Sequence, residues 1–426
     1  MLKMRKMKDS GIEWIGEIPE GWEIKYFVQL FSQVKNKNIG LREKNLLSLS
    51  YGKIKQKSIE TVGGLLPDNF EGYNIIDRND IVLRLTDLQN DQHSLRVGLS
   101  PERGIITSAY CSIRVRGAES PNYLYYYLHT FDIAKGFYGM GSGVRQGLNW
   151  DGLKYIKILL PPQHEQDRIS VFLNQKTLEI DSILSKTISS IEEYKKLKQA
   201  VIMQAVTKGV RGEREMKDSG VEWIGEIPKE WVCEKIKYVT SISRGLFNHR
   251  PRNDERYYNG KYPFIQTGDV ANATKYIVSY SQTLNELGKS VSKEFPKGTL
   301  TMTIAANVGD VAILNFDAYF PDSVVGFIPN KNIRTLYLFY VFSAMKDEFT
   351  RTAIKSTQLN LNIDRVKETF IPVTLNVNEQ CEIENYLESK CAEIDGLIAK
   401  KEQLVKELES YKKSLIYEVV TGKREV

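Results

Sequence analysis

Residues 7–22, MKDSGIEWIGEIPEGW, return at residues 216–231 as MKDSGVEWIGEIPKEW. Trp14 of the first copy corresponds to Trp223 of the second, an offset of 209 residues. Self-similarity at a fixed period is the signature of a repeated structural unit. The chain is therefore predicted to contain two copies of one unit in tandem.

A second pair of matching segments lies further along the chain. Glu165-Gln166 corresponds to Glu379-Gln380, and the match continues without a gap to the end of the chain at an offset of 214 residues. Between the matched segments, residues 24–147 share little with residues 233–360. Each half thus consists of a common frame around a variable insert. This pattern favours two modules that dock in the same way and recognise different targets.

The ends of the chain fit the same repeat. In the middle of the chain, a short linker connects Val206, near the end of the first copy, to Met216, at the start of the second. The C-terminal segment 420–426 resembles this linker, and it would lead in the same way into Met7 if the two ends of the chain were joined. We therefore expect the two termini to lie close together, in a pseudo-two-fold circular arrangement.

Two long segments, residues 165–206 and 379–420, have apolar residues at heptad spacing. A pattern sustained over about five heptads without proline is typical of a coiled coil. At roughly 1.5 Å per residue, each segment predicts a rod of about 60 Å. We expect the rods to pair antiparallel and to fix the distance between the modules; the alternative is two ordinary core helices of separate domains. The predicted seam residues are Leu173, Ile180, Leu184, Ile191, Tyr194, Val201, Leu387, Ile394, Ile398, Val405, Leu408 and Leu415, with Thr187, Lys198, Lys401 and Lys412 as polar members.

The inserts combine short strand-like runs with aromatic-rich helical stretches. Residues 80–85 and 299–304 are the strand-like runs, and residues 121–131 and 334–349 are the helical stretches. This mixture predicts compact α/β or α+β modules. The predicted organisation is a first recognition domain over residues 8–160, a central helix region over 161–215, a second recognition domain over 216–375 and a C-terminal helix region over 376–426.

A glycine-rich segment, residues 138–149, is the richest candidate loop of the first insert, and residues 355–360 are its counterpart. Glycine lets the backbone approach a partner closely, and Arg and Gln bind guanine and adenine edges bidentately. The alternative is a glycine-rich surface turn. The other basic or amide clusters are weaker signals, and they include Lys53, Lys55, Arg84, Arg244, Arg250, Arg252, Gln266 and Thr267. The predicted DNA-binding residues are Tyr138, Ser142, Arg145, Gln146, Arg84, Lys53, Lys55, Lys355, Ser356, Thr357, Gln358, Arg244, Gln266 and Thr267.

Composition is that of an ordinary soluble globular protein with at least two domains. The chain has 426 residues, 42% hydrophobic and 26% charged, with a net charge of +6 that suits a polyanionic partner without requiring one. It has no apolar run of the roughly 18 residues that a membrane span needs, and no secretory signal. Its four cysteines form no C-x-x-C pair and are expected to be reduced thiols of a cytoplasmic protein.

Motifs for catalysis are weak. Residues 137–141, FYGMG, match the F-x-G-x-G string of methyltransferases, but that motif follows a buried strand and the preceding residues 122–135 are predicted to be helical. Glu-x-Lys strings of the nuclease type begin at Glu23, Glu193 and Glu388, and two of them lie on the heptad segments. The chain is therefore predicted not to be an enzyme and to hold no metal.

Two alternatives from other classes remain. One is a self-contained DNA methyltransferase or nuclease with fused recognition domains, which would transfer labelled methyl groups to DNA without a partner. The other is a coiled-coil scaffold with two protein-binding modules, which would lack the salt-dependent binding that phosphate contacts give.

The architecture resembles the specificity subunits of type I restriction-modification systems over essentially the whole chain. The likeness rests on the module starts at 18–22 and 227–231, the module exits at 160–166 and 371–380, and the helix endings at 205–207 and 419–422. The second exit departs from the family pattern, because Pro372 stands alone and Asn376-Val377-Asn378 intervenes. We expect a locally altered loop there.

The resemblance implies a pair of target recognition domains, each binding one half of a split site in double-stranded DNA. It also implies that the helices bind two methyltransferase subunits and that restriction/translocase subunits join this complex. S-adenosylmethionine and ATP are then expected on those partners, with no cofactor in this chain and no membrane association. Individual base contacts do not follow from the resemblance, because members of the family differ in the recognition domains.

Overall fold

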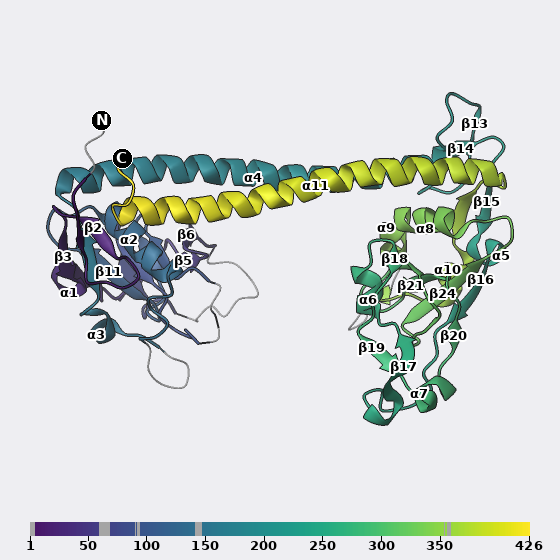
Figure 1. The fold of residues 1–426 in the computed structure, drawn as a ribbon, viewed down its shortest axis with the longest axis horizontal. Helices are drawn as coiled ribbons and strands as arrows, with labels where there is room; N and C mark the ends of the chain where they lie inside the picture. The colour runs from purple at the N-terminus through teal and green to yellow at the C-terminus, as the bar shows by residue number, and fades with distance from the viewer. Residues whose placement is uncertain are drawn as a thin grey trace. The chain divides into compact units, whose positions relative to one another are not determined.

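The computed structural model describes residues 5–58, 69–89, 91, 94–140, 147–352, 354–355 and 359–426, with side chains for all of these except 352, 354, 355, 359 and 360. The chain divides into two compact units (Figure 1). Unit 1 comprises residues 1–188 and 403–426, and unit 2 comprises residues 189–402. The long helices α4 (Gln163–Lys208) and α11 (Val377–Val420) each contribute one part to each unit. Each predicted recognition module therefore forms a unit with part of both helices.

The repeated frame has the same strands in both units. It begins with a short antiparallel hairpin, and its next strand pairs antiparallel with the strand just before the long helix. This second pairing places the two ends of the insert side by side. In unit 1 the strands are β1 (Met7–Asp9), β2 (Glu17–Pro19), β3 (Glu23–Tyr26) and β12 (Lys157–Leu160); in unit 2 they are β13 (Met216–Asp218), β14 (Glu226–Pro228), β15 (Val232–Lys235) and β27 (Phe370–Val373).

The inserts share a sheet although their sequences diverge. The strand order is β4-β11-β8-β9 in unit 1 and β16-β24-β21-β22 in unit 2, with all these neighbours antiparallel. In unit 2, β18 (Tyr276–Ile277) extends the sheet by pairing parallel with β22. The shared strands are β4 (Phe31–Gln33), β8 (Ile81–Leu83), β9 (Val97–Leu99) and β11 (Cys111–Val115) in unit 1, and β16 (Thr240–Arg244), β21 (Leu300–Thr303), β22 (Val311–Leu314) and β24 (Val324–Pro329) in unit 2.

The strands and helices expected in the inserts are present. The strand-like runs at 80–85 and 299–304 become β8 and β21, which are internal to their sheets and wholly buried. The first helical stretch is α2 (Pro121–Ile133). The second divides at Met345 into α8 (Thr335–Ala344) and α9 (Lys346–Thr352), so the expectation of one continuous stretch there was wrong.

Each insert also has elements that the other lacks. Unit 1 adds the strand pairs β5 (Leu47–Ser50) with β6 (Lys53–Gln56) and β7 (Asn74–Ile76) with β10 (Gly104–Ile106). Unit 2 adds a second sheet of order β19-β17-β23-β20. Its strands and flanking helices are β17 (Tyr258–Phe264), β19 (Gln282–Leu284), β20 (Glu294–Phe295), β23 (Ala318–Tyr319), α6 (Thr267–Asn272) and α7 (Glu286–Ser290). Short helices α1 (Phe27–Leu30), α3 (Trp150–Leu153), α5 (Ile236–Val239), η1 (Glu255–Tyr257) and α10 (Ile363–Glu368) and the strands β25 (Ile354–Lys355) and β26 (Leu359–Asn360) complete the chain.

The matched Glu-Gln pair at the start of each long helix joins frame, insert and helix. Glu379 in unit 2 accepts hydrogen bonds from Trp231 Nε1 at 3.1 Å, from Arg214 at 2.6 Å and from Thr374 Oγ1 at 3.0 Å. The next residue, Gln380, accepts from the backbone N–H of Arg334 at 2.8 Å, just before α8. Buried polar groups require such partners, so this motif recurs because it holds three parts of the unit together.

Unit 1 repeats this arrangement with its own residues. Glu165 accepts from Trp22 Nε1 at 2.9 Å and from Arg5 at 2.6 Å, and Gln166 accepts from the backbone N–H of Ser120 at 2.9 Å. The guanidinium of Arg5 lies 5.7 Å from the centre of the Trp22 ring. Burial opposes ionisation of Glu165, but the hydrogen bonds from Arg5 and Trp22 prevail and lower its pKa.

The long helices pack antiparallel within each unit. In unit 2, Lys198 Nζ lies 2.7 Å from Asp395 Oδ2. In unit 1, Lys412 Nζ lies 2.5 Å from Asp181 Oδ1. The two ion pairs are related by the 214-residue offset of the repeat, so the helices have the same register in both units. These lysines are two of the polar members expected in the apolar seam.

The predicted seam residues are all buried or half-buried. Ile180 and Leu415 belong to one buried cluster of unit 1, and Leu387 belongs to the buried cluster of unit 2. The buried seam residues are Leu173, Ile180, Ile191, Leu387, Ile394 and Leu415, and the half-buried ones are Leu184, Tyr194, Val201, Ile398, Val405 and Leu408.

The Asp181 ion pair gives unit 1 a defined pH dependence. Burial raises the pKa of Asp181, but hydrogen bonds from Lys412 and Lys53 outweigh it, and the net pKa is lowered. A carboxyl with a lowered folded-state pKa stabilises above its unfolded pKa of about 3.9, and that contribution disappears as the pH falls further. We expect Asp181→Asn to cost about 1 kcal/mol near neutral pH, with the difference from wild type vanishing at acid pH in urea unfolding. The matched variant Asp395→Asn, at a more exposed position, is expected to show a smaller effect; equal effects at both would contradict this account.

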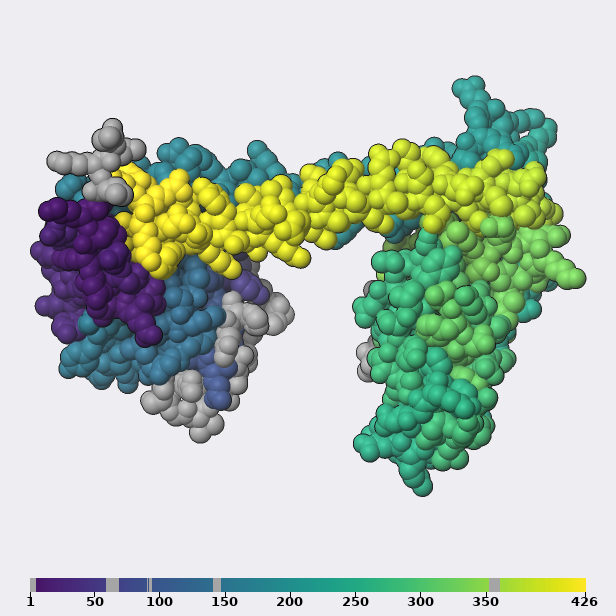
Figure 2. Space-filling model, viewed as in Figure 1, coloured from purple at the N-terminus to yellow at the C-terminus, as the bar shows by residue number. Residues whose placement is uncertain are grey.

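The chain termini meet in unit 1. Arg5 and Val426 line one small cavity with Trp22 and Glu165. Figure 2 shows the C-terminal end of the chain in yellow against the purple N-terminal segment. Gly422, two residues after the end of α11, has φ +74°, and an added Cβ there would lie 2.5 Å from Pro19, so the chain turns there against the frame. The expected closeness of the termini is confirmed.

Candidate nucleic-acid interface

The glycine-rich segment of unit 1 is anchored at both ends to one neighbouring segment. Its predicted DNA-binding residues Ser142, Arg145 and Gln146 lie outside the described residues. On one side, the Tyr138 hydroxyl accepts a 2.9 Å hydrogen bond from Arg96 Nε. On the other, the Leu148 backbone N–H donates to the Leu85 carbonyl at 2.9 Å. The predicted loop therefore starts and ends beside residues 84–96.

Arg96 organises that neighbouring segment from inside the unit. It is fully buried, and its guanidinium donates to the carbonyls of Arg84 at 3.1 Å and Thr86 at 2.8 Å. Its backbone N–H donates to Asp132 at 2.6 Å; burial nevertheless raises the pKa of Asp132 to about 6. Sequence reasoning missed Arg96, because its role depends on contacts with residues that are distant in the chain.

The other predicted DNA-binding residues of unit 1 differ in their exposure and in their bonding within the protein. Arg84 lies 3.6 Å from Asp91 and is half-buried. Lys53 bonds to Asp181 of α4 at 2.8 Å, so it ties the β5–β6 hairpin to the long helix. Lys55 is exposed on β6. Tyr138 bonds to Arg96 and lies under the Lys135 ammonium, 4.5 Å from its ring centre, which makes it a support for the loop.

Unit 2 ends its counterpart loop in the same way. The backbone N–H of Leu361 donates to the Ile304 carbonyl at 2.8 Å, directly after β21. In unit 1 the corresponding bond joins Leu148 to Leu85, after β8. Ser356, Thr357 and Gln358 lie outside the described residues, as does the side chain of Lys355. The residue that follows each loop is thus attached to its insert at an equivalent place.

A cluster of three arginines lies around Asp322 in unit 2. Arg244 donates from Nε to the Asp322 carbonyl at 2.5 Å. Arg250 lies 3.5 Å from the Asp322 carboxylate, and Arg252 donates to the same carboxylate. One carboxylate among three guanidinium groups leaves excess positive charge, and Arg250 and Arg252 are 54% and 45% exposed. Such a cluster suits phosphate oxygens.

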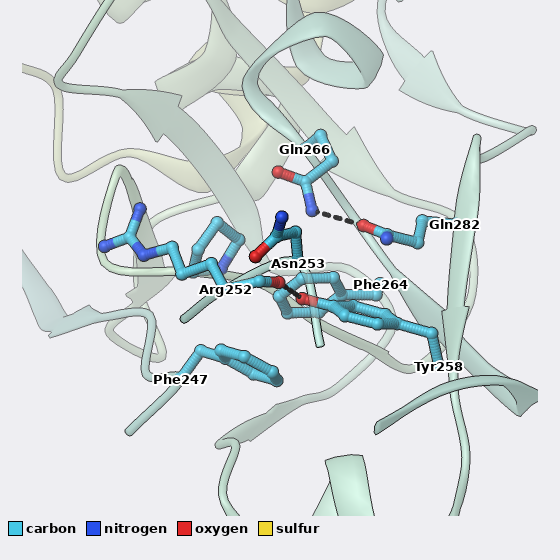
Figure 3. Close-up of a pocket in the computed structure, with 8 residues that line it drawn as sticks. Phe247, Arg252, Asn253, Tyr258, Phe264, Gln266 and Gln282 are labelled. Carbon is cyan, nitrogen blue, oxygen red and sulfur yellow. Dashed lines mark hydrogen bonds between the residues drawn. The ribbon is translucent and has the colours of Figure 1, made fainter. Parts of the chain in front are cut away.

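A cavity of about 240 Å³ lies beside this cluster (Figure 3). Its floor is aromatic, and its polar lining includes Arg252 and Asn253. Gln266 Nε2 donates to Gln282 Oε1 at 2.9 Å across it. Gln266 stands just before α6, Thr267 is the first residue of that helix and is half-buried, and Gln282 begins β19. The full lining is Phe247, Arg252, Asn253, Tyr258, Phe264, Gln266, Gln282 and Pro321.

The structure brings together predicted and unpredicted residues at this cavity. Gln266 was among the predicted DNA-binding residues and Arg252 was not, although both belonged to clusters judged weak. Gln282, Asn253 and Asp322 were missed. Asp322 is 70 residues from Arg252 in the chain, and only the fold brings such residues together.

In the described part of the chain, no group of three His, Cys, Asp or Glu residues could hold a metal ion. The F-x-G-x-G string follows the helix α2, which ends at Ile133, and does not follow a strand. Likewise, no helix in the described ranges is both long and apolar enough to span a membrane. All four cysteines are free thiols.

Known proteins share this architecture. The family model for the type I restriction modification DNA specificity domain matches residues 228–407. The chain is 26% identical to the putative type I restriction enzyme MjaX specificity subunit of Methanocaldococcus jannaschii, over 96% of this chain and 95% of that protein. It is 24% identical to the MjaVIII specificity subunit of the same organism, over 95% and 93%.

Solved structures agree on the fold. A structure from work on complex assembly and conformational transition of the type I R-M system has a TM-score of 0.72 at 15% identity, covering 96% of this chain and 99% of that one. The crystal structure of the HsdS subunit from Thermoanaerobacter tengcongensis has a TM-score of 0.51 at 15% identity, covering 96% and 98%.

The duplicated frame, the divergent inserts and these relatives indicate the class of protein, a DNA-specificity subunit. Over nearly its whole length the chain is similar in sequence to specificity subunits of type I restriction enzymes.

Proposed function

We propose that each unit binds one half of a split site in double-stranded DNA. The observation that supports this most is the pair of inserts: they share a sheet order and a loop attachment, yet differ in sequence and in added strands. Two scaffolds of one kind with different surfaces suit two different half-sites. Basic side chains such as Arg250 and Arg252 contact phosphates and set the position of the duplex.

The long helices have two roles in this proposal. Paired as an antiparallel coiled coil in a circular arrangement, they fix the length of the DNA spacer between the half-sites, as dimer geometry does in other DNA-binding proteins. They also bind two methyltransferase subunits, which restriction/translocase subunits join. S-adenosylmethionine and ATP then belong to those partners, and this chain directs their action to the target.

A methylation map tests the proposal. A host carrying this chain and its methyltransferase is expected to methylate a two-part motif with an unspecified spacer, and the purified chain alone is expected to transfer no methyl groups to DNA. Binding of the complex to that motif should weaken steeply with salt, because each phosphate contact releases counterions. A continuous motif, or methyl transfer by the chain alone, would refute the proposal.

The glycine-rich loop of unit 1 provides a second prediction. Replacing Arg145 and Gln146 by Ala should relax recognition in one half-site and leave the other unchanged, because the two units are separate. Each lost bidentate base contact is expected to weaken discrimination by about 1–3 kcal/mol. Methylation mapping of the variant measures this. An equal loss in both half-sites would mean that the loop positions the DNA and does not specify its sequence.

A further inference from the structure

The backbone around Asp322 is fixed by contacts that do not involve its side chain. Asp322 lies between β23 and β24 in unit 2, and the segment that follows β16 packs against it. The Gly245 backbone N–H donates to the Val324 carbonyl at 2.9 Å. A Cβ at Gly245 would lie 2.2 Å from the Pro321 carbonyl oxygen, so a side chain there would prevent this close approach. The position of Asp322 therefore does not depend on the arginines around it.

Arg250 and Arg252 differ in what holds their guanidinium groups. Arg250 donates to the carbonyls of Phe247 at 2.7 Å and His249 at 2.8 Å, and its other NH₂ group lies 3.5 Å from Asp322. Within the described part of the chain, the Arg252 side chain hydrogen-bonds to Asp322 alone. Asp322 thus holds Arg252 in place, whereas backbone carbonyls hold Arg250.

The Arg252–Asp322 ion pair lies at the surface of unit 2. Its two side chains are 45% and 34% exposed, so a second anion can reach both. The other carboxylate of this segment, Asp254, already lies 2.7 Å from Arg256 and 3.0 Å from His249. Asp322 is therefore the carboxylate with which an anion must compete for Arg252.

We propose that Asp322 competes with DNA phosphates for Arg252 and so weakens the binding of unit 2 to DNA that lacks its half-site. Carboxylate and phosphate oxygens accept the same charge-assisted hydrogen bonds from guanidinium. While Asp322 neutralises Arg252, a phosphate gains little from this arginine and is repelled by the carboxylate. A phosphate must displace Asp322 to gain the full interaction. The inference rests on the proposed function, because it requires unit 2 to bind DNA.

Target DNA and other DNA differ in what offsets the loss of the ion pair. On the target, base contacts hold the duplex in one position, so one phosphate stays beside Arg252 and displaces Asp322. On other DNA the duplex slides and takes many positions, so no phosphate is held there and the ion pair persists. Asp322 therefore determines specificity without contacting a base.

Salt-dependent binding to a duplex without the target tests the inference in the complex with the methyltransferase. Asp322→Asn removes the charge and nearly keeps the shape of the side chain. We expect this variant to bind the duplex roughly 2- to 5-fold more tightly, the range of one exposed ion pair. The slope of log K against log salt concentration should become steeper by about 0.9, because Arg252 then neutralises one more phosphate. Affinity for the mapped target should change less, so the ratio of the two affinities should fall.

Two further variants separate competition from a general change in charge. Glu286→Gln removes one negative charge from α7 of the same unit, where Glu286 accepts a 2.7 Å hydrogen bond from the Tyr262 hydroxyl, and it should leave the slope unchanged. In an Arg252→Ala background, Asp322→Asn should also leave the slope unchanged, because no guanidinium is released. If hydrogen exchange shows that Asp322→Asn unfolds unit 2, Asp322→Ser replaces it in the test.

Either of two results would overturn the inference: Asp322→Asn keeps the wild-type slope, or its effect persists in full when Arg252 is replaced by Ala. In both, the complex would still prefer its two-part site, so the proposed function would stand. If the wild-type complex bound target and other DNA equally well, the proposed function itself would fail.

Discussion

A seven-residue insertion in both long helices is expected to lengthen the DNA spacer and leave both half-sites unchanged. The structure identifies where to insert: the boundary between the units follows Ile188 in α4 and Glu402 in α11, positions related by the 214-residue offset. An insertion there adds one heptad to each helix, keeps the seam facing its partner and leaves the helix contacts within each unit intact. The Asp181–Lys412 and Lys198–Asp395 ion pairs should therefore still form.

The size of the change follows from helix and DNA geometry. Seven helical residues span about 10.5 Å, which is about three base pairs of duplex. Three base pairs also turn the duplex by about a third of a turn, which the complex must accommodate, so we expect an increase of about one to three base pairs. Methylation mapping of a host with the altered chain measures the spacer directly.

An insertion in one helix alone is the control. It shifts one helix against the other by a heptad, so the ion pairs of both units cannot form in one register, and specific methylation should be lost. If the double insertion left the spacer unchanged, the helices would not set the distance between half-sites.

Glu379→Ala is expected to destabilise unit 2 by about 3–5 kcal/mol, the range for removing one partner of a buried ion pair. The Glu379 side chain is 2% exposed and accepts from Arg214, Trp231 and Thr374. Its loss leaves the Trp231 N–H and the Thr374 hydroxyl without this acceptor. Arg214 keeps its exposed ion pair with Glu230 and its hydrogen bond to the Lys208 carbonyl. An unsatisfied buried donor adds about 1–3 kcal/mol of destabilisation.

The duplicated frame supplies a matched comparison. Glu165→Ala in unit 1 removes the same group, but Glu165 is 13% and Arg5 28% exposed, so water can replace part of the lost bonding and we expect about 1–3 kcal/mol. Hydrogen exchange in peptides covering β15 and β27 would locate the Glu379→Ala effect in unit 2. Glu379→Gln, which keeps an acceptor but no charge, should lie between wild type and Glu379→Ala. Equal losses for Glu165→Ala and Glu379→Ala would show that burial does not control this network.

The frame was predictable because its sequence occurs twice in the chain. Matched residues of the repeat make matched contacts: Trp22 donates to Glu165, and Trp231 donates to Glu379. The heptad pattern likewise predicted the long helices. Helix α4, for example, extends only two residues beyond the predicted segment at each end. Local periodicity is set by backbone geometry, so it survives in the sequence.

The shared sheet of the inserts was not predictable. Its strands are three to six residues long and pair across long stretches of chain, as β16 does with β24. Buried strand positions accept many apolar side chains, so two inserts can keep one sheet order without keeping one sequence. Only β8 and β21, which are fully apolar or buried along their length, were recognised.

Only part of the candidate site was predictable, because its residues come from segments that are distant in the chain. Arg, Gln and glycine content pointed to loops of the right chemistry, and Gln266 does line a cavity. Its partner Gln282 and the arginine-binding Asp322 come from other segments, so composition near Gln266 held no sign of them. Tyr138 and Lys53 had suitable chemistry, yet their polar atoms bond within the protein.

The pairing of β3 with β12, and of β15 with β27, brings the entry and exit of each insert onto adjacent strands. A foreign insert of different length can therefore replace the resident one if it preserves these two short strands and the loop attachment after the central strand. Under the proposed function, recombination at such points would produce new target sequences in single steps while the long helices stay the same. For a protein that recognises DNA, this geometry lets a new specificity arise without any change to the frame.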